Sequence, residues 1–68
     1  MITEIGFAAG DIWNYLDKHG ESTLKEILQG IRKPRDLALM SLGWLAREGH
    51  VTIDQAGRTY RIRLTGKG

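Results

Sequence analysis

The fold is decided by the stretch Pro34-Arg-Asp-Leu-Ala-Leu-Met-Ser-Leu-Gly-Trp-Leu-Ala-Arg-Glu-Gly49. Proline is favoured at the start of a helix, where its missing N–H would have no partner, and glycine is favoured just beyond the end. We therefore predict a helix over residues 34–48, with Pro34 as its first helical residue. At about 100° per residue, this helix carries a core stripe made of Ala38, Ser41, Leu42 and Leu45. A second, mainly apolar stripe lies roughly opposite, made of Lys33, Leu37, Met40, Trp44 and Arg47. A helix with two apolar stripes has two surfaces to bury. The functional question is therefore what the second stripe packs against.

Two further helices are predicted before this one. Ile5, Ala9, Ile12 and Leu16 recur at helical spacing and predict a helix over residues 3–19. Its glycines, Gly6 and Gly10, lower helix propensity, and we interpret them as sites where another backbone approaches closely. The segment Thr23-Leu-Lys-Glu26 fits a capping box and predicts a short helix over residues 23–29, which Gly30 should end.

After Gly49 the apolar period changes from helical to alternating. His50-Val-Thr-Ile-Asp54 alternates, Gln55-Ala56-Gly57 supplies a turn, and the residues from Arg58 to Thr65 alternate again. This pattern predicts a two-stranded hairpin over residues 50–65. A residue or two near Ser22 would add a third short strand in one version of this arrangement. Residues 1–68 are then a single small domain.

Composition and charge distribution limit the classes of site and partner that the chain can have. The chain has 68 residues, no cysteine and a net charge of +2, which excludes disulfides and thiolate metal sites. His19 and His50 lack ligand spacing, so we expect no metal. The apolar start has neither a basic n-region nor a run long enough for a membrane span, so we expect a cytoplasmic protein.

The charge is unevenly distributed along the chain: residues 1–28 carry five acidic and two basic side chains, and residues 29–68 carry eight basic and three acidic ones. The basic half indicates either a polyanion partner or a solvated surface with local salt bridges.

Three helices followed by a β-hairpin, with a glycine-containing turn between the second and third helices, resemble the winged helix–turn–helix superfamily. Thr23-Leu-Lys-Glu-Ile27 and Leu45-Ala-Arg-Glu-Gly-His-Val-Thr-Ile53 carry this likeness. More narrowly, Gly10-Asp-Ile-Trp13 and Trp44-Leu-Ala-Arg-Glu-Gly49 resemble a small bacterial stand-alone winged-helix family of unassigned function. The implied fold is α+β, mainly α, with a C-terminal hairpin wing.

The superfamily implies a DNA-binding module of transcription-regulator type, with double-stranded DNA as partner. By position, the helix over residues 34–48 would lie in the major groove and the wing would contact the backbone or minor groove. The residues expected at DNA are Thr23, Lys25, Lys33, Arg35, Arg47, Arg58, Arg61 and Arg63. Arg61 and Arg63 are equally well explained as charges that protect an edge strand from aggregation.

The sequence departs from this pattern on the outward face of the third helix. That face offers Leu37, Met40, Gly43 and Trp44, whereas bases are read by hydrogen bonds from polar side chains. The alternative is therefore a protein-interaction or homodimerisation module, with Phe7, Leu37, Met40 and Trp44 at the interface. Three interpretations of Trp44 remain open: packing under the wing against Tyr60 and Ile62, a homodimer interface, and contact with DNA or another partner.

An enzyme is not expected. The carboxylates are scattered over the predicted surface, Ser22 and Ser41 have no histidine partner, and no glycine-rich loop joins a strand to a helix as phosphate sites require. We accordingly expect no catalytic residue, no cofactor, no small-molecule substrate and no membrane partner.

Overall fold

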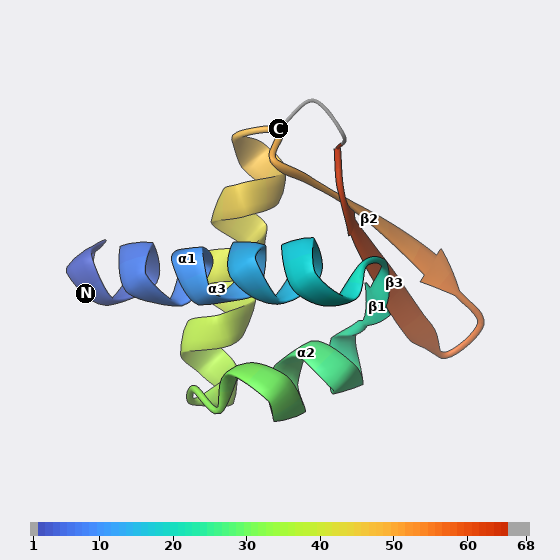
Figure 1. Ribbon diagram of the computed structural model, residues 1–68, viewed down its shortest axis with the longest axis horizontal. Helices are drawn as coiled ribbons and strands as arrows, with labels where there is room; N and C mark the ends of the chain where they lie inside the picture. Colours follow the sequence, from blue (N-terminus) through green and yellow to red (C-terminus); the bar gives the residue numbers. More distant parts are fainter. Residues whose placement is uncertain (1, 66–68) are drawn as a thin grey trace.

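The computed structural model describes residues 2–65 and contains three helices and a three-stranded sheet (Figure 1). In chain order the elements are α1 (Ile2–His19), β1 (Ser22–Thr23), α2 (Leu24–Ile31), α3 (Arg35–Arg47), β2 (Val51–Ala56) and β3 (Thr59–Leu64). Three helices followed by a C-terminal hairpin confirm the predicted α+β, mainly helical class. In Figure 1, α1 crosses α3, α2 lies beside the start of α3, and β2 and β3 extend to one side.

The sheet is antiparallel with the order β1-β3-β2, so that the last strand is the central one. In the hairpin Val51 pairs with Leu64, Ile53 with Ile62 and Ala56 with Thr59. The third short strand near Ser22 is confirmed, since Ser22 pairs with Ile62. The turn lies later than predicted: Gly57, with a φ of 65°, and Arg58 form a two-residue connection, whereas residues 55–57 were expected. Arg58 therefore stands at the tip of the wing.

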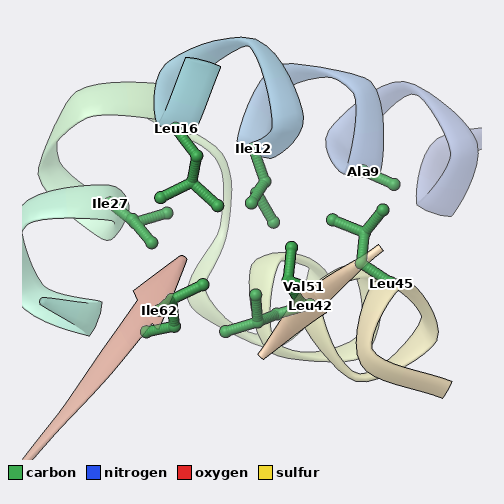
Figure 2. Close-up of a cluster of buried hydrophobic side chains, with 8 residues drawn as sticks. All are labelled: Ala9, Ile12, Leu16, Ile27, Leu42, Leu45, Val51 and Ile62. Atoms are coloured by element: carbon green, nitrogen blue, oxygen red, sulfur yellow. The ribbon is translucent and has the colours of Figure 1, made fainter. Parts of the chain in front are cut away.

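The core is formed by one stripe from each helix and by inward residues of the hairpin (Figure 2). Ile12 of α1, Ile27 of α2 and Ile62 of β3 are completely buried. Full burial of such a side chain contributes roughly 1.5–3 kcal/mol. The cluster drawn in Figure 2 comprises Ala9, Ile12, Leu16, Ile27, Leu42, Leu45, Val51 and Ile62. It joins all three helices to the wing and so fixes the position of the wing relative to α3.

Gly30 does not end α2, contrary to prediction, because the helix continues to Ile31 and is capped by Arg32 with a φ of 57°. Ile31 is half-buried against the core, which stabilises the additional helical residue. The interpretation of Gly6 and Gly10 is also wrong within this chain, because a β-carbon at either position would meet nothing within 4 Å. The glycine that permits a close approach is Gly30, which packs against the ring of Tyr15.

The boundaries of α3 follow from backbone chemistry. Pro34 occupies the N-cap rather than the predicted first helical position: its φ and ψ are −54° and 141°, and its carbonyl accepts the Ala38 N–H at 2.9 Å. At the other end Gly49 has a φ of 82°, as residues just beyond helix ends often do. The N–H groups of Gly49 and His50 donate to the carbonyls of Ala46 and Leu45 at 3.1 and 2.9 Å. This Schellman motif turns the chain sharply from α3 into β2.

Candidate nucleic-acid interface

A shallow groove of about 290 Å³ lies between α2, the start of α3 and the tip of the wing. Three cations from three different elements line it: Lys25 in the first turn of α2, Arg35 at the first residue of α3, and Arg58 in the β2–β3 turn. The remaining lining residues are Leu24, Leu28, Gln29, Thr59 and Tyr60. The structure thus brings together three of the residues that the sequence had placed at DNA.

The three groove cations, Lys25, Arg35 and Arg58, are exposed, and within residues 2–65 none of them forms an ion pair. Their charge is therefore not neutralised by a nearby carboxylate in the described part of the chain. Positive charges gathered in one concave region reinforce one another's field and attract anions. The groove has the electrostatic character expected of a phosphate-binding surface.

Three other predicted cations are paired with carboxylates. The shortest N–O distances are 3.4 Å from Lys33 to Asp11, 3.5 Å from Arg61 to Glu21 and 2.6 Å from Arg63 to Asp54. All six side chains are at least a third exposed, so each pair contributes little to stability, roughly 0–1 kcal/mol. Their main effect is on the surface field, because each carboxylate offsets the positive charge beside it.

Thr23 and Arg47 complete the predicted set, and both lie outside the groove lining. The Thr23 hydroxyl accepts the Glu26 N–H at 3.2 Å, and the Glu26 carboxylate accepts the Thr23 N–H at 2.8 Å. Thr23 is therefore engaged as the cap of α2. Arg47 is exposed at the last residue of α3, about 18 Å along the helix axis from Arg35.

A second hollow, of about 350 Å³, lies between Trp44 and the first turns of α1. Its lining is Ile2, Ile5, Gly6 and Trp44. Trp44 is 47% exposed, and its ring lies 6.3 Å from that of His50. The interpretation that Trp44 packs under the wing is wrong. Trp44 lies on the α1 side of α3, whereas Tyr60 lines the basic groove.

Of the four residues predicted for a protein interface, Leu37, Met40 and Trp44 share one face of α3, and Phe7 lies apart from them on α1. Met40, 43% exposed, precedes Trp44 by one helical turn and shares its face of α3. Leu37 is half-buried. Phe7 is 68% exposed but follows Ile5 by about 200° around α1, so it points away from the Trp44 hollow. Sequence reasoning missed Ile2 and Ile5 as neighbours of Trp44, because nothing in the pattern shows where α1 extends beyond the core.

The groove lining also includes Gln29, Thr59 and Tyr60, which the sequence analysis did not place at DNA. Their side chains carry hydrogen-bonding groups, whereas the prediction had used positive charge alone.

Within residues 2–65 there is no group of three or more side chains placed to hold a metal ion. No helix in that same range has the length and hydropathy required to cross a bilayer.

Comparison with known families defines the class of protein. Residues 1–64 match the family described as winged helix-turn-helix domain (DUF2582), and the chain belongs to that family. The resemblance to the winged-helix superfamily is therefore confirmed, and this fold is commonly a DNA-binding one. No curated protein and no solved structure matched the chain.

Proposed function

We propose that this domain binds double-stranded DNA as a module of transcription-regulator type, with Lys25, Arg35 and Arg58 as its principal contacts. The observation that carries the proposal is the convergence of these three cations on one groove, where none of them forms an ion pair with another residue of the described range 2–65. The groove opens beside the start of α3 and the wing tip, and winged-helix domains commonly contact DNA with these two parts.

The chemistry of the groove suits a phosphodiester backbone. Arginine presents a planar fork of donors that matches phosphate, and lysine supplies a point charge. Gln29, Thr59 and Tyr60 add neutral donors beside these cations, and such side chains commonly bond to phosphate oxygens and sugars. Arg35 also lies at the N-terminal end of α3, where the helix dipole favours an anion.

The remaining predicted contacts take subordinate roles in this proposal. Arg61 and Arg63 are exposed on the strand that follows the wing tip, and opening their surface pairs costs roughly 0–1 kcal/mol. Lys33 is held by Asp11 in the same way. Arg47 would contact a phosphate beyond the far end of α3, and Thr23 would position α2 through its cap.

The direct test is fluorescence anisotropy with a labelled duplex over a range of salt concentrations. Binding should weaken steeply with salt, and the Arg35→Gln, Arg58→Gln double variant should reduce both the affinity and the salt dependence. Lys18→Gln is the matched control for Arg35→Gln alone, because it also removes one positive charge, but from α1, away from the groove. Absence of salt-sensitive binding at micromolar protein would contradict the proposal.

A second candidate function is protein interaction through the apolar hollow at Trp44, with a homodimer as the simplest case. It is favoured by the half-exposed Trp44 beside Ile2 and Ile5, an aromatic and aliphatic set typical of interface centres. Light scattering at high concentration tests it. A dimeric wild type and a soluble, smaller Trp44→Ala variant would support it, and a wild-type monomer would contradict self-association.

A further inference from the structure

The exposed face of α3 has few groups that can distinguish one base from another. Its middle turns present Leu39, Met40 and Gly43, with Leu39 37% and Met40 43% exposed. None of the three supplies a strong hydrogen-bond donor or acceptor. Base pairs are distinguished in the major groove mainly by arginine, lysine, asparagine and glutamine. The middle turns of α3 therefore carry little information about sequence.

The exposed charged side chains of α3 lie at its ends. Arg35 lines the groove together with Lys25 of α2 and Arg58 of the wing tip, so it belongs to a set of cations spread over three elements. Arg47 is about 18 Å away along the axis. Asp36 follows Arg35 and is exposed, and its negative charge is repelled by phosphate. The arrangement concentrates favourable charge where a backbone would run, and not along the middle of the helix.

We infer that this domain binds duplex DNA of any sequence, holding phosphates with Lys25, Arg35 and Arg58 and leaving the base edges unread. The inference rests on the proposed function and specifies its substrate class. Contacts to phosphate orient a protein on the duplex but carry no direct sequence information. Binding by such contacts is governed by counterion release, which depends on charge and salt.

The number of groove cations sets the expected salt dependence. The three groove contacts alone predict a slope of log K against log salt of about −2.7. Raising the salt from 50 to 200 mM should then weaken binding by about 40-fold. The slope should be the same for every duplex, because the same three side chains make the contacts each time.

The experiment measures affinity for three labelled duplexes of equal length, one rich in G·C pairs, one rich in A·T pairs and one mixed, alongside selection from a random-sequence pool. We expect affinities within about three-fold of one another and no enriched motif, since even one mismatched pair in a specific site usually has a larger effect. Met40→Ala should leave all three affinities unchanged. If Met40 did contact thymine methyl groups, the variant would lose affinity for the A·T-rich duplex in particular.

Variants at Arg35 separate phosphate contact from base reading. Arg35→Lys keeps the charge but loses the paired donors that recognise guanine, so it should retain binding to all three duplexes. Arg35→Gln should weaken binding to all three equally and reduce the salt slope by about 0.9.

The contrary outcomes are distinct. A selected motif bound about ten-fold or more tighter than the pool, or a loss in Arg35→Lys confined to the G·C-rich duplex, would overturn this inference and leave the proposed function standing. If none of the duplexes is bound in a salt-sensitive manner, the proposed function fails, and the inference fails with it.

Discussion

The ring of Tyr15 on α1 occupies the space that a side chain at position 30 of α2 would need. A β-carbon at Gly30 would overlap Cε2 and Cδ2 of Tyr15. The ring also lies against that of His19 in a tilted arrangement, with centroids 4.3 Å apart, so it has a neighbour on its own helix. This contact sets how closely α2 approaches α1.

Gly30→Ala should therefore destabilise the domain, although alanine is the better helix former. Moving the Tyr15 ring or the helix should lower the free energy of unfolding by about 1–3 kcal/mol. Gly43→Ala is the control. Gly43 is an exposed residue inside α3 whose β-carbon would meet nothing within 4 Å, so alanine there should raise stability by roughly 0.5–1 kcal/mol. Urea unfolding of both variants checks the pair, and equal shifts in the same direction would contradict the packing role of Gly30.

Removal of the cap of α2 should weaken the domain by a smaller amount. Thr23→Ala deletes the hydroxyl that accepts the Glu26 N–H, and such losses lower the free energy of unfolding by about 0.5–2 kcal/mol. Thr23→Ser retains the acceptor and should stay close to the wild type. Thermal unfolding followed by circular dichroism measures both, and similar losses in the two variants would show that the methyl group matters more than the hydroxyl.

Truncation of Ile62 should have the largest effect of these substitutions. Ile62 is completely buried and belongs to the central strand, where it joins the wing to the helices. Ile62→Ala should lower the free energy of unfolding by about 2–5 kcal/mol, which is a large fraction of what so small a domain possesses. Ile53, opposite it on β2 and 37% exposed, provides the comparison: Ile53→Ala should cost less, as chemical denaturation of both variants will measure.

Release of Arg63 from its ion pair with Asp54 should strengthen DNA binding if the wing contacts the DNA backbone. Asp54 holds Arg63 at 2.6 Å, so Asp54→Asn removes the neutralising carboxylate with little change in shape. We expect higher affinity and a salt slope steeper by up to about 0.9. Asp17→Asn on α1 makes the same change of charge away from the wing, and an equal gain from that variant would mean that net charge alone is responsible.

The overall fold was accessible from the sequence because its signals are local. The helical spacing of Ile5, Ala9, Ile12 and Leu16 predicts α1, and the capping box starting at Thr23 predicts the start of α2. The error at the end of α2 arose because tertiary packing determines local structure there. Ile31 extends α2 past Gly30 by packing against the core, and no pattern within residues 23–31 reveals that contact.

The candidate site was only partly accessible for the same reason. Sequence position identifies Lys25, Arg35 and Arg58 as cations, but their convergence depends on how α2, α3 and the wing pack together. The pair between Arg61 and Glu21 is similarly tertiary, since 40 positions separate the two residues, whereas the pair between Arg63 and Asp54 lies within the hairpin. The surroundings of Trp44 could not be predicted from the sequence either, because they depend on where α1 lies relative to α3.

The strand order β1-β3-β2 has a consequence for the synthesis of the protein. β3 is formed by Thr59–Leu64, yet it is the strand that pairs with both of the others. A nascent chain that has not yet emerged past Leu64 leaves β1 and β2 without their partner and the core without Ile62. Folding on the ribosome must therefore wait until nearly all of the described chain has left the exit tunnel, and the domain should fold in a single late step.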